Sequence, residues 1–403
     1  MPVVTEAKKI DAFLTRGVEN VYPSRDFVKA WLSKGERLTI YLGVDPTGPT
    51  LHLGHVIPLM KLRELQDLGH KVILLIGDFT AMIGDPTDKT ATRKKQTRKE
   101  VLANAKHYKA QAGKILNFSG SNKAELKYNS QWLANMSLAD LVELAAHTTV
   151  QRLEERDMFE KRREDGKPVF MHEFLYPIMQ GYDSVAMSVD GEIGGNDQTF
   201  NMLVGRDFVK ALKKKEKFVI ATKLLTDPTG KKMGKSEGNM ITLEDSAEQM
   251  FGKVMSWGDA MIVPGFEVLT RVDEAELKAI EGALKSENPR DLKMRLARAV
   301  AAFFHGEKAA AKAQEAFAST FQRHETPTDI PTLVVKKAKV NILDVLADAK
   351  LVASKGEAKR LIDGGGVKVG GHVIEGYDAE VIPSAEGVVV QKGKRHFVRV
   401  VKG

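Results

Sequence analysis

The alternation of short apolar runs with amphipathic stretches constrains the fold of this chain more than any other feature. The run Leu38–Gly43 is apolar and β-branched and predicts a buried strand. Turn-forming residues at Asp45–Pro49 separate it from a helical pattern over His52–Leu68. Lys71–Gly77 predicts a second buried strand, and a charged helix is expected near 93–112. Strand, loop and helix repeated in this order indicate an α/β fold with a parallel sheet and crossover helices.

The remaining patterns are mostly helical. Residues 1–36 have a charged, helical pattern. Beyond residue 112 the predicted elements are, in chain order, helices over Glu154–Glu164, His172–Ser188 and Asn196–Lys213, a strand over Phe218–Thr222, a flexible loop from about Leu225 to Asn239, and helices from 244 to 323. Two prolines in His324–Thr332 indicate a linker. The tail after it predicts a helix, a triple-glycine turn and short strands.

Charge and cysteine content narrow the class of protein. The formal net charge is +8, and residues 331–403 hold 13 Lys and Arg against 8 Asp and Glu. A basic excess gathered in one segment favours a polyanionic partner such as RNA over a membrane. The chain has no cysteine, which excludes disulfides and Cys-ligated zinc. Its ten histidines show no zinc-ligand spacing, so we expect no protein-bound metal.

No segment predicts export or membrane insertion. The first residues lack the apolar core of a secretory signal. No apolar run approaches the ~20 residues that a bilayer-spanning helix needs. The expected location is the cytoplasm.

The first candidate site is the sequence His52-Leu53-Gly54-His55, at the start of a helix that directly follows a strand. A helix N-terminus offers unpaired N–H groups and the positive end of a dipole, and both suit a phosphate. Gly54 would let a base or ribose approach the backbone, and the two histidines would supply hydrogen-bond donors. The alternative is an ordinary helix start with two solvated histidines.

The second candidate is the glycine-rich stretch that contains Lys232-Met233-Gly234-Lys235-Ser236. Lysines on a mobile loop can reach a bound triphosphate and neutralise the charge that develops as pyrophosphate leaves. A solvated turn is the alternative for such a loop taken alone.

Three further stretches combine glycine with polar side chains. Asp85 follows Ile83-Gly84 and could bind an ammonium group, while Lys89 and Arg93 would share a helix face that could reach pyrophosphate. Tyr176, Gln180 and Asp183 also fall on one helix face, among apolar neighbours, where polar groups need partners. Paired glycines precede Asn196-Asp197-Gln198, so that Asp197 could accept from ribose hydroxyls. A turn, an amphipathic helix and an N-capped loop are the respective alternatives.

Together these motifs resemble the class I aminoacyl-tRNA synthetases. The string YLGVDPTGPTLHLGH is similar to the HIGH motif of the tyrosyl and tryptophanyl branch, and KMGKS is similar to the KMSKS loop. The combination with the helix-face and double-glycine motifs looks like tyrosyl-tRNA synthetase. The resemblance spans about residues 20–400 and implies that the chain is a tyrosine–tRNA ligase. Gly234 in the loop, Thr199-Phe200 after the double-glycine motif, and Leu42 and Pro58 depart from common family patterns.

The resemblance also implies roles for individual residues. Matches to Tyr41 and Asp183 bind the substrate phenol, and matches to Asp85, Tyr176 and Gln180 hold its amino group. Matches to Asp45, Gly54, Gly195, Asp197 and Gln198 line the tyrosine and adenylate site. Matches to Thr47, His52, His55, Lys89, Arg93, Lys232 and Lys235 serve the phosphates. ATP with Mg²⁺ would be the nucleotide substrate.

The tail from Lys339 onward resembles the S-four-like RNA-binding domain. Its basic helix would present Ser354, Lys355, Lys359 and Arg360 to phosphates, although a small charged domain without a ligand is the alternative. The implied architecture is as follows: a Rossmann-like catalytic domain over 1–230, with an inserted dimerisation region at about 125–190; an α-helical anticodon-side domain with the KMSKS-type loop over 231–325; a linker over 326–336; and an S-four-like α+β domain over 337–403.

The implied reaction has two steps. The tyrosine carboxylate attacks the α-phosphate of ATP, and the terminal ribose of tRNA(Tyr) then takes the tyrosyl group. A homodimer is expected from the family. A tryptophanyl-tRNA synthetase and a non-catalytic RNA-binding paralogue are the alternative functions.

Overall fold

The computed structural model describes residues 2–85, 95–155, 157–226, 240–322, 330–352, 354–384, 386–393 and 396–403. It divides into two compact units, residues 1–310 and 311–403, and each is described by itself. Among the described residues, we find no helix with the length and apolar character that crossing a membrane requires.

The first unit holds the sheet that the apolar runs predict. Its elements are α1 (Ala7–Thr15), β1 (Val18–Tyr22), α2 (Arg25–Leu32), β2 (Thr39–Val44), α3 (Leu53–Asp67), β3 (Lys71–Ile76), α4 (Thr80–Ile83), α5 (Arg98–Ala105), α6 (Tyr108–Ala112), β4 (Glu125–Tyr128), α7 (Ser130–Leu133), α8 (Leu138–Ala145), α9 (Val150–Glu154), α10 (Asp157–Glu164), α11 (Met171–Ala186), β5 (Gly191–Gly195), α12 (Thr199–Lys213), β6 (Phe218–Thr222), α13 (Ala247–Met255), α14 (Ile262–Leu269), α15 (Glu274–Ala283) and α16 (Pro289–His305). The helix α17 (Glu307–Gln322) runs across the division between the units.

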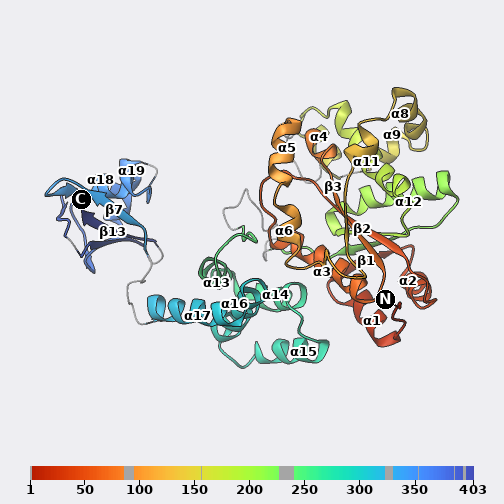
Figure 1. The fold of residues 1–403 in the computed structure, drawn as a ribbon. Coiled ribbons are helices and arrows are strands. Elements are labelled where there is room, and N and C mark those ends of the chain that lie inside the picture. The colour runs from red at the N-terminus through yellow and green to blue at the C-terminus, as the bar shows by residue number, and fades with distance from the viewer. Residues whose placement is uncertain are drawn as a thin grey trace. The chain divides into compact units, whose positions relative to one another are not determined.

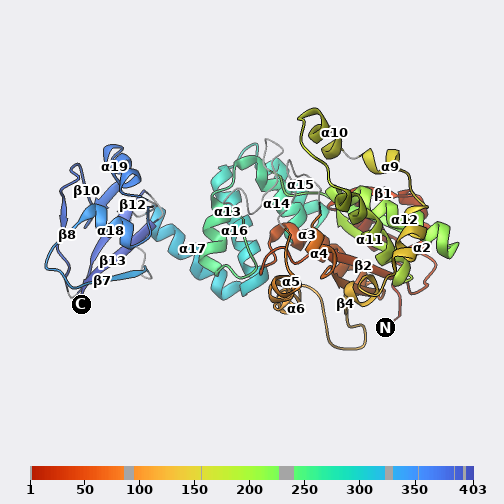
Figure 2. The same cartoon turned by 90° about the horizontal axis from the view of Figure 1, so that it is seen from above.

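The six strands follow the order β1-β6-β5-β2-β3-β4. Strands β2 to β6 pair in parallel, whereas β1 pairs antiparallel with β6 at the edge. Every residue of β6, and all but the first of β3, is buried, as expected for parallel strands covered on both faces. Helix α3 packs against β2, β3 and β5, and α12 packs against β5 and β6. Figure 1 shows the strands at the centre of this unit, with helices around them, and Figure 2 shows α11 and α12 alongside one another.

The prediction of an α/β fold with a parallel sheet is confirmed, but residues 1–36 are not wholly helical. They contain β1, whose sequence VENVY carries two polar residues that stay exposed. An edge strand is solvated along one side and needs no continuous apolar run, so its pattern resembled a charged helix. The charged helix expected over Glu154–Glu164 corresponds to α10, which covers Asp157–Glu164, whereas Glu154 is the last residue of α9. The helix expected near 93–112 comprises α5 and α6 where the structure describes it.

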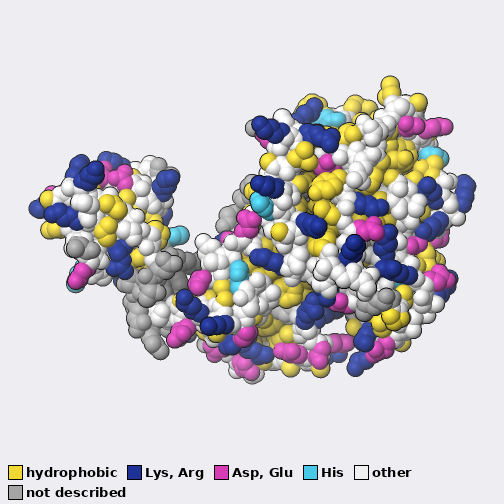
Figure 3. All heavy atoms as spheres, in the orientation of Figure 1, with side chains coloured by type: hydrophobic (Ala, Val, Ile, Leu, Met, Phe, Trp, Pro, Cys, Tyr) yellow, Lys and Arg dark blue, Asp and Glu magenta, His cyan; other side chains and the backbone are white. Residues whose placement is uncertain are grey.

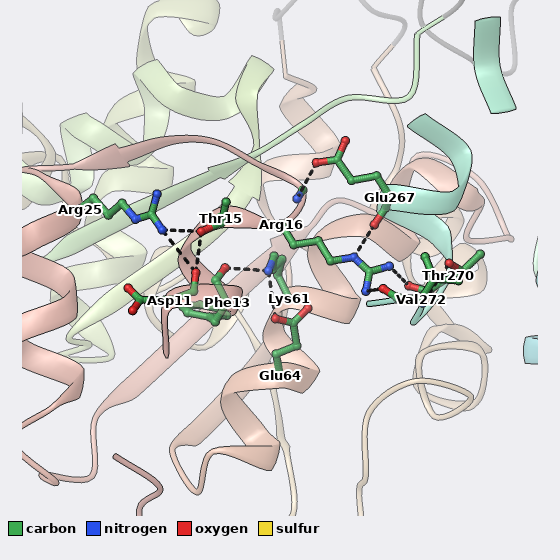
Figure 4. A network of polar contacts seen from close by, with 11 residues as sticks. Asp11, Phe13, Thr15, Arg16, Arg25, Lys61, Glu64, Glu267, Thr270 and Val272 are labelled. Carbon is green, nitrogen blue, oxygen red and sulfur yellow. Dashed lines mark hydrogen bonds and ion pairs between the residues drawn. The ribbon is translucent and has the colours of Figure 1, made fainter. Parts of the chain in front are cut away.

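A partly buried arginine connects the N-terminal helix to the helical part of this unit. Arg16, at the end of α1, donates to the carbonyl oxygens of Glu267 (2.9 Å), Phe266 (3.2 Å), Thr270 (2.6 Å) and Val272. These carbonyls belong to the last turn of α14 and the residues after it, where a helix leaves its acceptors without intrahelical partners. Figure 4 shows the guanidinium reaching this helix end, with the Lys61–Glu64 pair of α3 beside it.

The second unit is a small α+β fold. Its elements are β7 (Thr332–Val335), β8 (Val340–Asn341), α18 (Ile342–Asp348), α19 (Lys355–Asp363), β9 (Val367–Val369), β10 (His372–Val373), β11 (Glu380–Val381), β12 (Val388–Lys392) and β13 (His396–Lys402). The sheet order is β10-β9-β12-β13-β7, and β11 pairs with β8. Its core is aliphatic and includes Ile342, Leu346, Ile362, Val390 and Val400.

We expect Arg16→Ala to lower the free energy of unfolding of the first unit by about 2–3 kcal/mol, because four carbonyls lose the guanidinium donor, although that of Phe266 also accepts from Thr270 Oγ1. Urea unfolding followed by tryptophan fluorescence measures this unit selectively, since Trp31, Trp132 and Trp257 all lie in it. Lys9→Ala removes an exposed ion pair with Glu6, the residue before α1, and should change the free energy of unfolding by less than about 0.5 kcal/mol. Equal effects of the two variants would contradict the capping role of Arg16.

Candidate active site

A cavity of about 490 Å³ opens at the carboxyl ends of the parallel strands. It is lined by residues of β2, β5 and α11, by the loop after β2 and by the start of α3. The chain leaves β2 toward β3 on one side, and β5 follows on the other, so the strand order reverses here. Ligands of open α/β sheets bind at such a reversal point.

Asp45 directly follows β2 and lines the cavity. Its carboxylate accepts from Tyr176 Oη at 3.0 Å and from Thr80 Oγ1 at 2.7 Å, so it connects β2 with α11 and α4. Gly77, at the end of β3, makes room for this carboxylate, because a Cβ there would lie 1.9 Å from Asp45 Oδ1. Two neighbouring strand ends are therefore fitted to each other at the cavity wall.

Asp183 is a buried carboxylate on the cavity wall. It accepts from Trp132 Nε1 at 2.7 Å and from Asn129 Nδ2 at 3.3 Å. Burial raises the pKa of Asp183 well above its ordinary value, although these two donors act in the opposite direction. Tyr41 lines the same cavity, and its hydroxyl bonds with Ser184 Oγ at 3.0 Å. Burial is also the main cause that raises the pKa of Tyr41.

A third carboxylate, that of Asp85, belongs to a chain of amide contacts. Gln198 Nε2 donates to Asp85 Oδ2 at 2.6 Å, and Asn201 Nδ2 donates to Gln198 Oε1 at 2.9 Å. Because its nitrogen faces a carboxylate and its oxygen faces a donor, the Gln198 amide has one favoured orientation. Gly195 and Asp197, next to Gln198, line the same cavity.

The two histidines form a reciprocal cap at the start of α3. His52 Nδ1 accepts from Gly54 N at 3.1 Å, and His55 Nδ1 accepts from His52 N at 3.2 Å. Burial lowers the pKa of His52 to about 4, and burial together with His52 lowers that of His55 well below its ordinary value. Both rings are therefore neutral at pH 7. Since each Nδ1 is an acceptor, each ring carries its proton on Nε2, which can donate to a ligand.

The cavity gathers most of the residues that the sequence motifs single out. Those that line it are Tyr41, Asp45, Thr47, His52, Gly54, His55, Asp85, Tyr176, Gln180, Asp183, Gly195, Asp197 and Gln198. Lys89, Arg93, Lys232, Gly234 and Lys235 lie outside the described residues. Ser354, Lys355, Lys359 and Arg360 belong to the second unit.

Sequence reasoning missed several polar residues at or behind the cavity wall, including Asn129, Trp132, Glu192 and Lys217. A carboxylate inside the glycine-rich strand GEIGG was a usable signal for Glu192. Lys217 follows a run of charged residues that is typical of a solvated surface, so nothing in the sequence marked its burial. In the portion of the chain that the structure describes, we find no cluster of three or more His, Cys, Asp or Glu with metal-binding geometry.

Comparisons with known proteins identify the family. The model for class I tRNA synthetases (W and Y) matches residues 33–322. The model for the tyrosine–tRNA ligase SYY-like C-terminal domain matches residues 322–400. The chain is 43% identical over 393 residues to the tyrosine–tRNA ligase of Moorella thermoacetica, covering 96% of this chain and 94% of the relative. It is 44% identical over 393 residues to that of Thermotoga maritima, covering 97% and 96%. The chain belongs to the tyrosyl-tRNA synthetase family of class I.

Solved structures show the same fold. A C-terminally truncated mitochondrial tyrosyl-tRNA synthetase of Coccidioides posadasii is 27% identical with a TM-score of 0.63, and the match covers 77% of this chain and 94% of that one. The Archaeoglobus fulgidus tyrosyl-tRNA synthetase complexed with L-tyrosine, 23% identical, matches the fold with a TM-score of 0.62 over 77% of this chain and all of that one. The family hypothesis is confirmed, and the chain is an aminoacyl-tRNA ligase. A tyrosine–tRNA ligase is thereby favoured over the tryptophanyl and the non-catalytic alternatives.

We expect His52 to make stability depend on pH. Its pKa is about 4 in the folded chain against 6.5 for the unfolded group, so the unfolded state binds the proton first. The contribution is fully present above about pH 6.5 and is lost as the pH falls toward 4. Asn is also a good N-cap and does not titrate, so His52→Asn should lose less stability than the parent chain between about pH 7.5 and about pH 5. The thermal unfolding midpoints of both proteins at the two pH values measure this difference. Equal decreases in the parent chain and in His52→Asn would contradict the role of His52.

Proposed function

We propose that this tyrosine–tRNA ligase binds the tyrosine side chain against Asp183 and places ATP along the N-terminus of α3. The observation that carries the proposal is the position of Asp183: a buried carboxylate with donors on both oxygens lines the cavity that also contains the His52–His55 cap. The phenol hydroxyl exchanges a hydrogen bond with Asp183, and Tyr41 lies on the same cavity wall. Bound phenylalanine has no hydroxyl and would leave the buried carboxyl group of Asp183 without this hydrogen bond, which is unfavourable.

The substrate ammonium lies among polar groups of α11 and the loop after β3. Asp85 supplies a negative charge, and Tyr176 and Gln180 supply neutral oxygens. Asp45, Gly195, Asp197 and Gln198 surround the adenylate. Support for this arrangement comes from the shared cavity and from the contacts that hold Asp85 and Gln198 together.

The phosphates lie at the start of α3, where Thr47, Gly54 and both histidines line the cavity. A neutral Nε2–H donates to a phosphate oxygen, and the helix N-terminus adds its dipole. Lys89, Arg93, Lys232 and Lys235, which lie outside the described residues, complete the phosphate site on the family pattern. Mg²⁺ accompanies ATP through phosphate oxygens and water, as is usual for this ion.

The first step needs no protein base, because the attacking carboxylate is already an anion. One of its oxygens forms a bond to the α-phosphorus, and the bond from that phosphorus to the pyrophosphate oxygen breaks. The chain's contribution is positioning and stabilisation of negative charge. In the second step a terminal ribose hydroxyl of tRNA(Tyr) attacks the tyrosyl carbonyl, and AMP leaves.

The second unit contacts the tRNA. Ser354 caps α19 and accepts from Glu357 N at 3.2 Å. The basic side chains Lys355, Lys359 and Arg360 of this helix are exposed. Lys355 pairs with Asp344, and Lys359 lies 5.2 Å from the ring centre of Tyr377. Lys and Arg side chains are spread over the visible face of this unit in Figure 3, with acidic side chains among them. Lys355, Lys359 and Arg360 suit the phosphates of RNA. Because tRNA is a cytoplasmic partner in bacteria, we infer a cytoplasmic location.

A second copy of this chain covers an apolar surface on the predicted insertion. Leu138 and Val142 lie on one face of α8 and are 76% and 62% exposed, and Val150 of α9 and Met171 of α11 are exposed as well. Apolar side chains gather over this region in Figure 3. Contiguous exposed apolar surface marks interaction sites on folded proteins, and the family pattern assigns this region to dimer formation.

We expect Asp183→Asn to raise the KM for tyrosine at least about tenfold and to reduce the preference for tyrosine over phenylalanine by a similar factor, because it replaces one oxygen of a buried carboxyl group by an NH₂ group, which cannot accept a hydrogen bond. Amino-acid-dependent ATP–pyrophosphate exchange measures both, and the KM for ATP is the internal control. A variant that keeps the preference unchanged would refute the placement of the phenol.

We expect the double substitution Leu138→Asp with Val142→Asp to halve the mass of the particle in solution, because it buries two charges without partners in the dimer contact. Light scattering coupled to size exclusion measures the mass. Leu102→Asp, an exposed leucine on α5, is the matched control and should leave the mass unchanged. A monomeric parent chain would overturn the proposal directly.

A further inference from the structure

A buried ion pair lies behind the cavity wall, and none of the assigned roles uses it. Lys217 immediately precedes β6 and is 0% exposed, and its partner Glu192 on β5 is 2% exposed. Glu192 lines the cavity and is the register partner of Tyr41 on the neighbouring strand β2. Ser184 of α11, also fully buried, bonds with the Tyr41 hydroxyl on one side and accepts from Lys217 on the other.

The surroundings of Lys217 fit an ammonium group closely. Its Nζ donates to Glu192 Oε2, to Ser184 Oγ at 2.8 Å and to the Met202 carbonyl at 3.2 Å, which uses all three donors. Gly205 of α12 leaves the necessary room, because a Cβ there would lie 2.8 Å from Nζ and 2.8 Å from Ser184 Oγ. A buried ion pair adds little net stability over apolar packing, so its contacts with the cavity are the more informative feature.

Glu192 transmits the effect of Lys217 to the cavity. Its second oxygen, Oε1, accepts from Gln180 Nε2 at 3.3 Å. An ionised carboxylate only accepts, so the nitrogen of the Gln180 amide must face Glu192. The amide oxygen is then left for the cavity, where a substrate ammonium requires acceptors.

We propose that Lys217 is a positioning residue for tyrosine, because it keeps Glu192 ionised and so holds the Gln180 amide with its oxygen toward the substrate ammonium. The inference rests on the proposed role of Gln180 in binding that ammonium. A protonated Glu192 could donate to the amide oxygen instead. The amide would then turn its NH₂ group toward the ammonium, which repels it.

The other charged and titratable groups around this pair do not replace the lysine. Tyr41 on β2 and Asp183 on α11 are acidic, as is Asp45 beyond them, and Arg206 of α12 acts on Lys217 rather than pairing with Glu192. Burial lowers the pKa of Lys217, whereas Glu192 raises it. Without Lys217, Glu192 would be a buried carboxylate beside other acidic groups and would take up a proton more readily.

The test is Lys217→Met in the full-length enzyme, with tyrosine-dependent ATP–pyrophosphate exchange measured between about pH 6 and about pH 8.5. In the Lys217→Met variant, we expect the KM for tyrosine to be at least about tenfold higher than in the parent enzyme near pH 6.5 and to fall as the pH rises and Glu192 ionises. In the parent enzyme the KM for tyrosine should be nearly independent of pH. The kcat and the KM for ATP should change by less than about threefold, since the phosphate site is untouched.

Lys215→Met is the matched control. Lys215 joins the same two segments through a more exposed ion pair with Asp190 at 2.6 Å, and its loss should leave the KM for tyrosine unchanged. The double variant Lys217→Met with Glu192→Gln removes both buried charges, so its stability should recover relative to Lys217→Met. Its KM should stay raised and lose the pH dependence, because the amide that replaces the carboxylate does not titrate and can donate as well as accept.

Two results separate the possible failures. If Gln180→Ala leaves the KM for tyrosine unchanged, the proposed role of Gln180 is wrong and the inference falls with it. If Gln180→Ala raises that KM but Lys217→Met does not, or raises it without pH dependence, only the inference about Lys217 is overturned. If Lys217 had only a structural role, Lys217→Met would raise the KM for tyrosine without pH dependence. The double variant would then recover both the stability and the KM of the parent enzyme.

Discussion

The parallel pairing of β2 with its two neighbours is the constraint on which the site depends. Tyr41 lies opposite Ile73 of β3 and opposite Glu192 of β5, so one residue fixes the register on both sides. Because parallel strands end at the same edge, this pairing brings the loop after β2, the start of α3 and the double glycine after β5 to one cavity. A shift of one residue in β2 would turn Tyr41 to the opposite face and move Asp45 away from Gly77 and Tyr176.

The cavity holds several carboxylates in little solvent, which is electrostatically unfavourable unless each has partners. The partners differ from one carboxylate to the next. Asp45 accepts from two hydroxyls, Asp183 from an indole and an amide, and Asp85 from a glutamine. Glu192 pairs with a fully buried cation, Lys217. A wall of acceptors suits an amino-acid ammonium, and the neutral histidines at the other side supply donors to phosphate without adding a repulsive charge.

Local patterns anticipated much of this site. The apolar runs predicted β2, β3 and β6, since parallel strands covered on both faces need continuous apolar sequence. The spacing of Tyr176, Gln180 and Asp183 correctly placed all three on one helix and at one cavity. The edge strand β1 was missed because its exposed polar residues erase the strand pattern. Trp132 and Asn129 were missed because α7 and the residue before it follow a different strand, and only the parallel β3–β4 pairing brings them to Asp183.

The sequence by itself determined the α/β class, the helix that begins at the His52–His55 motif and the family, because these depend on local periodicity and on short motifs whose chemistry acts within a few residues. Only the tertiary structure decided which polar groups face one another. Lys217 follows a run of lysines and glutamate that is typical of a solvated surface, yet it is buried. Its ammonium group fits because α12 has a glycine, Gly205, next to it, and because Glu192 of β5 supplies a carboxylate. The burial of a side chain and the choice of its ion-pair partner depend on segments that are far apart in the sequence and pack together in the fold. A local sequence pattern does not contain that information.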